Sequence, residues 1–476
     1  PGMDSADPFT IPSADVLFVW GANSTASNSH LPPLINQCKQ NGGTVVVVDP
    51  RRTGIAERSD LHVALLPGTD AVFAMTLASE LSRRGVLDTA FISQHVSGAD
   101  EFLKACSAWT LESGARECGV EVSVIAQCVD LLENHSKAML RIGWGVERNI
   151  NGGSGMLAVL SLWAVAGKFG QEGSGVLAST SRKSSESVSA MLPRIDVSRN
   201  TINMNHVGRL LAQTTTPTVL LVQGANPVVT ANDQQSMIAA MMNENVFTVV
   251  HEQVMTDTAR MADVVLPAAA FGEKNGTTTN LEGRISNVAQ KITPAGTSRP
   301  DWMIAAELAT ALGKDLGVGS VEEVTAKLAN TVAQFAPAVN TKALRHDGVL
   351  MNHPAPLTLS RTTLPVQDRN SYDYRIVSFR KLYDAAVGTA KSPSLAQLAT
   401  GATVIVHPLD LARIGVELGA NVQVISTKAT AVLPVTTSED VLRGTAWLPF
   451  NQSGNDAREI FDARADIVDV RIEKLA

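Results

Sequence analysis

Two segments of the chain combine residue types that suit the recognition of a nucleotide. Each has a Gly-Ala-Asn turn after an apolar run, at Gly21 and at Gly224, and an acid 28 residues after that glycine, at Asp49 and at Glu252. A glycine lets backbone amides approach a ligand closely, and an acid after the next strand suits contact with a nucleoside. The spacing predicts phosphate at each turn and nucleoside at each acid, although G-x-G-x-x-G is absent from both turns.

The two segments are copies of one unit. Counted from the acid, Thr lies at +4, Ala at +7 and Asp at +11 in both copies. The matching pairs are Thr53 and Thr256, Ala56 and Ala259, and Asp60 and Asp263. Two copies imply a symmetric pair of sites, or one extended ligand held from both sides. The alternative is a duplicated scaffold that binds nothing.

Strands buried in a sheet must position these residues. Apolar, mostly β-branched runs of the kind found in parallel sheets occur at 15–20, 44–48, 218–222 and 247–250. Helices are expected to follow the turns, over 31–40 and 234–243. Ligands of open α/β sheets bind beyond the carboxyl ends of the strands. The sequence predicts the α/β class, with two Rossmann-like doubly wound domains over 12–165 and 166–335.

A further acid precedes the next expected helix, over 71–84. Pro67-Gly68-Thr69-Asp70 leads into that helix, and the Asp70 carboxylate could contact a ligand. Thr69 or Asp70 could equally cap the helix by accepting hydrogen bonds from its free amides. Both interpretations of Asp70 stay open at this point.

Two other segments are candidates for ligand contact. Gly143-Trp144-Gly145 follows an expected strand over 138–142, and its glycines would let the backbone contact a flat heterocycle, although a lone G-x-G is a weak signal. Residues 272–284, including Asn280, form a polar stretch punctuated by glycines. Its many donors suit an anionic or polar ligand, or equally a solvated turn.

The pattern changes beyond residue 335. Residues 336–398 have few periodic apolar runs and are expected to form a connecting segment. Short strands with regular turn signals then predict a small β-barrel domain over 399–476. One of its loops contains Asn451 and Asn455, and this domain could cover a ligand that the α/β domains hold.

Charge and composition exclude several classes of function. The 476 residues include 39 Lys and Arg against 46 Asp and Glu, a net charge of −7. Without a basic run, nucleic-acid binding is not expected. No apolar run reaches the roughly 18 residues of a membrane-spanning helix. The four cysteines lack the spacings of iron–sulfur or zinc sites, so no metal site is predicted and we expect reduced, buried thiols.

Taken together, these landmarks resemble the large subunit of the molybdopterin oxidoreductase superfamily, which includes formate dehydrogenases. Trp20-Gly21-Ala22-Asn23, Asp49-Pro50-Arg51-Arg52-Thr53, Pro67-Gly68-Thr69-Asp70, Gly143-Trp144-Gly145 and Gly224-Ala225-Asn226-Pro227 carry the resemblance. It implies two Rossmann-like domains that hold two molybdopterin guanine dinucleotides with Mo or W, beneath a C-terminal double-psi β-barrel. The residues implied for one arm of the cofactor are Gly21, Asn23, Ser24, Asp49, Arg51, Thr53, Gly68, Asp70, Gly143, Trp144 and Gly145. Those implied for the other arm and the pterins are Gly224, Asn226, Glu252, Thr256, Asp257, Asn280, Asn451 and Asn455.

The second half is similar more narrowly to the large subunit of NADH–quinone oxidoreductase (complex I), in its actinobacterial form. The likeness lies in 273–284, 296–304, 380–384, 392–396 and 448–452. That resemblance implies a scaffold without pterin, which supports electron transfer from NADH to quinone beside iron–sulfur and flavin-bearing subunits and, indirectly, a membrane arm. We take it as the first hypothesis. A molybdenum or tungsten oxidoreductase such as a formate dehydrogenase-like enzyme is the alternative.

The resemblance also implies elements upstream of residue 1. In the family, an iron–sulfur domain and then the Cys, selenocysteine or Ser that ligates the metal precede this region, and the four cysteines here lie in no matching context. The chain lacks an initiator Met, so we expect a fragment or mature product. A cytoplasmic location is expected, with contact to the membrane only through partners. No acid or base catalyst is assigned; His251, beside Glu252, is the most interesting histidine.

Overall fold

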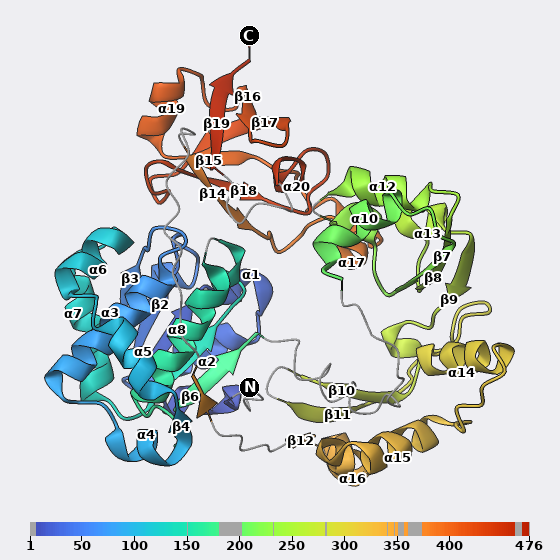
Figure 1. The fold of residues 1–476 in the computed structure, drawn as a ribbon, viewed down its shortest axis with the longest axis horizontal. Coiled ribbons are helices and arrows are strands. Elements are labelled where there is room, and N and C mark those ends of the chain that lie inside the picture. Colours follow the sequence, from blue (N-terminus) through green and yellow to red (C-terminus); the bar gives the residue numbers. More distant parts are fainter. Residues whose placement is uncertain are drawn as a thin grey trace. The chain divides into compact units, whose positions relative to one another are not determined.

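The computed structural model describes most of the chain in two compact units (Figure 1). The described residues are 6–149, 151–179, 202–231, 233–280, 283–339, 341–346, 348–350, 357–359, 374–461 and 469–475. The first unit comprises Pro1–Ser179 and Pro354–Ala476, and the second comprises Thr180–His353. Each unit is described by itself below.

A five-stranded parallel sheet forms the centre of the N-terminal part of the first unit. Its order is β3-β2-β1-β5-β6. The strands are β1 (Val16–Trp20), β2 (Thr44–Val48), β3 (Leu61–Val63), β5 (Ala138–Ile142) and β6 (Gly175–Ala178). Every residue of β1 and β5 is buried, as the apolar runs predict. Strand β6 extends this sheet beyond residue 165, where the first domain was expected to end, because its apolar Gly-Val-Leu-Ala run pairs with β5.

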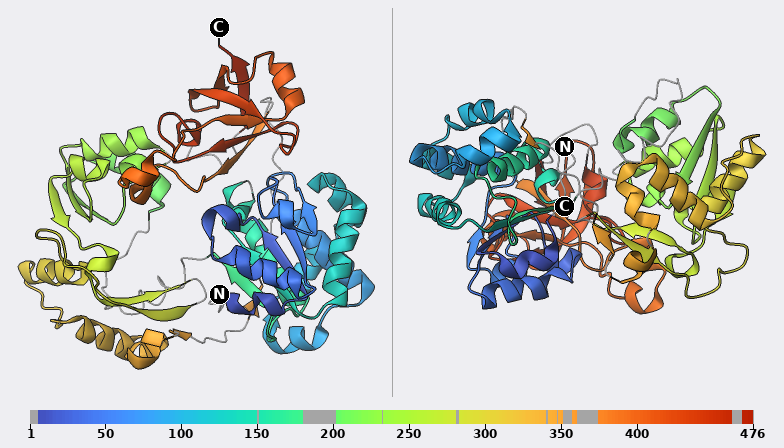
Figure 2. Two further views of the ribbon diagram at one scale, coloured as in Figure 1. Left: turned by 180° about the vertical axis from the view of Figure 1, so that it is seen from behind. Right: turned by 90° about the horizontal axis from the view of Figure 1, so that it is seen from below.

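Helices cover both faces of this sheet. On one face, Leu31 and Ile35 of α2 (Leu31–Gln40) pack with Leu17 and Val19 of β1. On the other, α3 (Asp70–Arg84) and α8 (Gly152–Val165) pack against Val16, Phe18 and Trp20. The right-hand view of Figure 2 shows these layers, with the dark blue helix below the sheet and lighter blue helices above it. The remaining elements are η1 (Pro8–Ser13), α1 (Ser24–Ser27), η2 (Ala56–Arg58), α4 (Thr89–His95), β4 (Val96–Ser97), α5 (Ala99–Cys106), α6 (Leu111–Cys118), α7 (Val122–Asn134), η3 (Val146–Arg148) and β13 (Leu357–Thr358).

The second unit contains a shorter version of the same arrangement. Its described strands β7 (Thr218–Gln223), β8 (Val246–Glu252) and β9 (Val264–Pro267) form a parallel sheet. Helices α10 (Met204–Ala212) and α12 (Gln234–Met241) contribute to a core with Leu220 of β7. The other elements are α11 (Pro227–Thr230), α13 (Asp257–Met261), η4 (Phe271–Glu273), β10 (Gly276–Thr279), β11 (Arg284–Val288), α14 (Asp301–Ala311), α15 (Val321–Thr331), η5 (Ala333–Val339), α16 (Thr341–His346) and β12 (Val349–Leu350).

The internal repeat is a repeat of backbone geometry. Trp20 lies opposite Val48 in the first sheet, and Gln223 lies opposite His251 in the second. The next residue in each strand closes the same turn: the Gly21 amide donates to the Val48 carbonyl, and the Gly224 amide to the His251 carbonyl. The two copies therefore share the register as well as the spacing of their sequence landmarks.

The shared residues at +4 and +11 have structural roles in both copies. The Thr53 and Thr256 hydroxyls accept hydrogen bonds from the amides three residues ahead, of Ala56 and Ala259. The Asp60 carboxylate accepts from the Val45 amide at 2.8 Å, and the Asp263 carboxylate accepts from the Thr248 amide at 2.6 Å. These acids therefore attach the start of the third strand to the second strand in each copy.

The C-terminal part of the first unit is a closed six-stranded barrel, which confirms the expected fold class. Its order is β14-β18-β15-β17-β16-β19. The strands are β14 (Tyr374–Phe379), β15 (Val404–Val406), β16 (Asn421–Ile425), β17 (Thr430–Thr437), β18 (Thr445–Pro449) and β19 (Asp469–Lys474), and the helices are α17 (Val387–Ala390), α18 (Pro393–Ala396), α19 (Pro408–Ile414) and α20 (Ala457–Ile460). Strand β14 belongs to the segment expected to be a connection. Its parallel pairing with β18 spans about 70 residues of sequence, which no local pattern reveals.

No described helix combines the length and apolar character needed to cross a membrane.

The structural role of the repeated acids is testable by amide hydrogen exchange. Replacing Asp60 or Asp263 with Ala removes a charge-assisted hydrogen bond worth about 1.5–3 kcal/mol, so the Val45 or Thr248 amide respectively should exchange about ten- to a hundredfold faster. Asp60→Asn and Asp263→Asn keep an acceptor oxygen and should show a smaller change. Unchanged exchange in the Ala variants would contradict the assignment.

Candidate functional site

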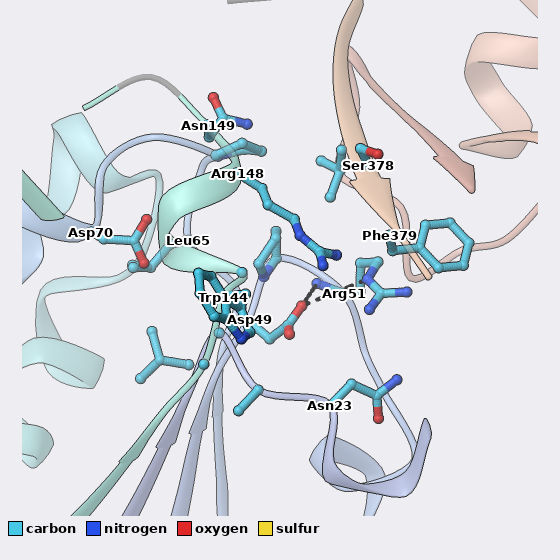
Figure 3. Close-up of a pocket in the computed structure, with 18 of the residues that line it drawn as sticks. Asn23, Asp49, Arg51, Leu65, Asp70, Trp144, Arg148, Asn149, Ser378 and Phe379 are labelled. Carbon is cyan, nitrogen blue, oxygen red and sulfur yellow. Dashed lines mark hydrogen bonds and ion pairs between the residues drawn. The ribbon is translucent and has the colours of Figure 1, made fainter. Parts of the chain in front are cut away.

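A pocket opens at the carboxyl edge of the first sheet (Figure 3). Its walls come from the ends of β1, β2 and β5 and from β14 of the barrel. It is open to solvent, and the space within it and its mouth comes to about 1040 Å³. The position agrees with the rule that ligands of open α/β sheets bind beyond the carboxyl ends of the strands.

Three glycines bring two turns together at the floor of the pocket. Gly21 has a φ of +56°, which favours glycine. A Cβ atom at Gly143 would lie 2.5 Å from the Gly21 carbonyl oxygen, and one at Gly145 would lie 2.6 Å from it. These glycines are required by the packing of one turn on the other. Contact of their backbone with a flat heterocycle stays a prediction, and the half-exposed indole of Trp144 lies beside them.

Asp49 lies at the end of β2 with its carboxylate largely buried. Its Oδ1 accepts from the Arg51 amide at 2.9 Å, and the Arg51 Nε lies 3.9 Å from the same oxygen. Desolvation raises the pKa of Asp49, and the charge and amide of Arg51 act in the opposite direction. An acid in this environment is stabilised by ligand N–H donors, because they replace the water that burial removes.

Asp70 is the second carboxylate of the pocket. Its Oδ1 accepts from the Trp20 indole Nε1 at 2.7 Å, which joins the first turn of α3 to the end of β1. Burial raises the pKa of Asp70 to about 6, and the bond from Trp20 counteracts part of this shift. Thr69 is the N-cap residue of α3, but its hydroxyl donates to the Leu66 carbonyl. No side-chain hydrogen bond caps α3, so the capping interpretation of Thr69 and Asp70 is wrong.

Guanidinium groups from both parts of the first unit line the same pocket as these acids. Arg51 lies 4.3 Å from the ring centre of Phe379, and Arg148 lies 4.9 Å from that of Phe450. Burial is the main cause that lowers the pKa of Arg148, and the nearby charges of Arg380 and Arg51 lower it further. In Figure 3 the Arg148 side chain extends toward Arg51 and Asp49. The cluster gives this side of the pocket an excess of positive charge, which suits an anionic group.

Most residues predicted for the first arm line this pocket. Lining residues among them are Gly21, Asn23, Asp49, Arg51, Gly68, Asp70, Gly143, Trp144 and Gly145. Ser24 and Thr53 are buried and do not line it. Ser179 also lines the pocket, and the residues that follow it, 180–201, lie outside the described residues.

Sequence reasoning missed the other charged lining residues. They are Arg141, Arg148 and Arg380. Arg141 and Arg148 flank the Gly-Trp-Gly turn, so a survey of cations beside glycine turns would have found them. Arg380 follows β14, and only the long-range closure of the barrel brings it here.

The residues predicted for the second arm lie in the second unit, and several are tied into its structure. The Asn226 Oδ1 accepts from the Thr258 amide and hydroxyl, and the Asn280 Oδ1 accepts from the Arg284 amide. Thr256 caps α13, which begins at Asp257. Residues 276–279 and 284–288 form a hairpin rather than a loop, because the β-branched threonines favour strands.

The acid of the second copy sits at the end of β8, as Asp49 sits at the end of β2. The Glu252 Oε1 accepts from the Gln253 amide at 2.8 Å. Gly224 has a φ of +57°, and no atom lies within 4 Å of where its Cβ would be. Unlike Gly21, it leaves open space beside the turn. His251 is buried, with its Nε2 3.5 Å from the Asp301 carboxylate.

The loop after β18 contains buried acceptors that lack a donor. Asn451 has a φ of +58° and is 4% exposed. Within the described part of the chain, its Oδ1 and the Oε1 of Gln452 have no hydrogen-bond partner. Asn455 donates through Nδ2 to the Val432 carbonyl. A pterin carries several N–H donors, so Asn451 and Gln452 fit such a group, whereas Asn455 is already engaged.

No cluster of three or more His, Cys, Asp or Glu residues suited to a metal ion occurs among the described residues. The four cysteines are free and buried, as expected from their spacing. Desolvation is the largest cause that raises the pKa of each thiol, to about 11 for Cys38 and about 12 for the other three. These thiols are therefore protonated and poor metal ligands at neutral pH.

Comparison with known families agrees with this architecture. Residues 5–311 match the molybdopterin oxidoreductase family, and residues 374–467 match the molybdopterin dinucleotide-binding domain. The chain belongs to the molybdopterin oxidoreductase family.

Several characterised proteins are similar to the chain over most of its length. The alpha subunit of the F420-dependent formate dehydrogenase of Methanocaldococcus jannaschii is 24% identical over 92% of this chain and 72% of its own. The assimilatory nitrate reductase catalytic subunit of Bacillus subtilis is 23% identical over 96% and 72%. The structure of acetylene hydratase from Pelobacter acetylenicus aligns with a TM-score of 0.73 at 17% identity, over 99% of this chain and 79% of that one. These matches support a molybdopterin oxidoreductase and do not support the first hypothesis, the large subunit of complex I.

The raised pKa of Asp70 can be tested through the pH dependence of stability in the Asp70→Asn variant. The folded-state pKa of Asp70 lies near 6, above the ordinary value of about 4, so ionisation of this acid destabilises the fold. Asn keeps an acceptor for Trp20 and cannot ionise. The variant should therefore match wild type below about pH 4 and gain up to about 3 kcal/mol above pH 6.

Urea unfolding followed by tryptophan fluorescence across pH 4–8 measures this difference. Asp100→Asn, which alters an exposed carboxylate, should show no such gain with pH. A flat difference between wild type and Asp70→Asn would contradict the shifted pKa of Asp70.

Proposed function

We propose that the chain is the cofactor-binding body of a molybdenum or tungsten oxidoreductase of the formate dehydrogenase-like kind, with molybdopterin guanine dinucleotide as cofactor. One observation carries the proposal: a buried carboxylate, Asp49, and a partly buried one, Asp70, line one pocket together with several arginines. A nucleotide carries N–H donors on its base and negative charge on its phosphate. This pocket has acceptors for the donors and cations for the charge.

The pocket residues divide into three roles in this proposal. Asp49 and Asp70 accept from the base and ribose of one guanosine, because a carboxylate is an acceptor on both oxygens. Arg51, Arg148 and Arg380 hold the pyrophosphate, where guanidinium forks match phosphate oxygens. The exposed face of Trp144 covers a ring of the ligand.

The repeat extends the proposal to a second arm of the cofactor. Gly224 and Glu252 occupy the positions of Gly21 and Asp49 in the shared register, and the space beside Gly224 leaves room for a ligand. Asn226, Thr256, Asp257 and Asn280 contribute by fixing the surrounding loops. Asn451 and Gln452 accept from a pterin.

When bound, the metal–pterin group supplies the two-electron redox chemistry, and the chain supplies binding and orientation. The relatives described as alpha subunits of formate dehydrogenases support redox partner subunits. We therefore include partner subunits with iron–sulfur clusters and flavin, and a cytoplasmic location, in the proposal. The complex I scaffold has less support, because the similar proteins are molybdopterin enzymes.

The deciding experiment is the metal and pterin content of the full-length native protein. Elemental analysis for Mo, W and Fe, with fluorescence of oxidised pterins, should give about one Mo or W and about two pterins per chain on the bis-dinucleotide proposal. Iron without pterin, Mo or W would overturn it and favour the scaffold.

Replacing the two repeat acids tests their contact with the nucleotides. Asp49→Ala and Glu252→Ala each remove a charge-assisted hydrogen bond of about 1.5–3 kcal/mol, which lowers affinity about ten- to a hundredfold. Pterin per chain after purification should fall in both variants while the fold persists. Glu57→Ala, which alters an exposed acid that does not line the pocket, is the control and should retain wild-type pterin. Unchanged pterin in both repeat variants would reject the assignment.

A further inference from the structure

The side chain that contacts the Asp70 carboxylate comes from the residue before the Gly21 turn. Trp20 is the last residue of β1 and is fully buried, and its indole Nε1 donates to the Asp70 Oδ1 at 2.7 Å. The same indole packs edge-on against Phe73, with 5.5 Å between the ring centres. Asp70 and Phe73 both belong to α3, so one indole holds the start of this helix through a polar and an apolar contact.

The Asp70 carboxylate is in an environment that disfavours its charge. The residue is partly buried, and a Cβ atom at Gly155 of α8 would lie only 3.3 Å from the Asp70 Cβ. Loss of water around a carboxylate favours its neutral form. An N–H donor has the opposite effect, because hydrogen bonds to an ionised acceptor are about twice as strong as those to a neutral one.

The charged groups near Asp70 do not replace the indole in this role. Desolvation is the largest cause that raises the pKa of Asp70, and the bond from Trp20 is the largest cause that lowers it. The charge of Asp49 raises the pKa further, and the Cys118 thiol, with a pKa raised by burial to about 12, stays neutral. The other charged residues that line the pocket are Arg51, Arg141, Arg148 and Arg380.

We propose that Trp20 is a positioning residue for nucleotide recognition, whose indole N–H holds the Asp70 carboxylate as the anion that accepts from guanosine. This inference rests on the proposed function, because it names the group that prepares one of the contacts of that site. A carboxylate oxygen accepts at two places, so the bond from Trp20 leaves capacity on both oxygens of Asp70. A protonated acid would instead place an O–H donor opposite the N–H donors of the ligand.

The probe is the methyl ester of guanosine 5′-monophosphate, because its phosphate keeps a single charge between about pH 5 and pH 8. It is titrated into the 476-residue chain, produced in a host that does not make molybdopterin and labelled with ¹⁵N in its six indoles. The NMR signal of Trp144, which lines the pocket, reports binding. Wild-type affinity should be constant at high pH and should fall below a midpoint near pH 6.

Trp20→Phe keeps an aromatic ring beside Phe73 and loses the N–H donor. Without that donor the pKa of Asp70 rises, so the midpoint of binding should move up by about one pH unit. Affinity for the probe should therefore fall about fivefold at pH 6 and change little at pH 8.

Trp163 provides a matched control. It is also fully buried in the core of the first sheet, packs edge-on against Phe18, and donates from Nε1 to the Ala138 carbonyl at 3.2 Å. Trp163→Phe should lower the melting temperature about as much as Trp20→Phe and leave the midpoint of binding at its wild-type pH. A merely structural role of Trp20 would give both variants the same pH profile.

If Trp20→Phe fails to fold, the wild-type protein still decides. The Trp20 indole proton should titrate with a midpoint near pH 6, and that midpoint should fall when the probe is bound. A Trp20 signal that does not titrate, an unmoved midpoint in the variant, or an equal loss of affinity at every pH would overturn the inference. Wild type that binds no probe at any pH would reject the proposed function, and this inference with it.

Discussion

The parallel pairing of β1 with both β2 and β5 is the constraint on which the site depends. Because the three strands run the same way, their carboxyl ends meet at one edge, and Gly21, Asp49 and Gly143 come together there from positions far apart in the sequence. The turn after β1 favours glycine at position 21 because of its positive φ. The turn after β5 requires Gly143 and Gly145, because a Cβ atom at either would clash with the Gly21 carbonyl oxygen. The register of the sheet thus determines both where the pocket opens and which residues its floor tolerates.

The repeat shows that a residue shared by two copies need not be shared for binding. The hydroxyl of the threonine at +4 accepts a hydrogen bond from the amide three residues ahead in each copy, and the aspartate at +11 attaches the third strand to the second. What the copies share most strictly is the scaffold. Their ligand-facing details differ, because the space beside Gly21 is filled by Val146, whereas the space beside Gly224 is open.

Local patterns were enough to predict the α/β class and the strands β1, β2, β5, β7 and β8. The resemblance to the family added the full set of nine predicted residues that line the pocket. Apolar β-branched runs and glycine turns are defined by a few consecutive residues, so they can be recognised without knowledge of the fold. The contribution of Phe379 and Arg380 could not be, since it depends on β14 pairing with β18. The burial of Arg141 was also hidden, because a single cation in an apolar run does not reveal which way it points.

The stacking of Arg51 and Arg148 on aromatic rings of the barrel has a consequence for the order of biosynthesis. Those rings, Phe379 and Phe450, are made more than 200 residues after the arginines that they cover. The whole first sheet is therefore synthesised well before the barrel residues that line the pocket with it. During that interval the floor of the pocket is open to water. The last strands to be translated therefore complete the wall of the pocket.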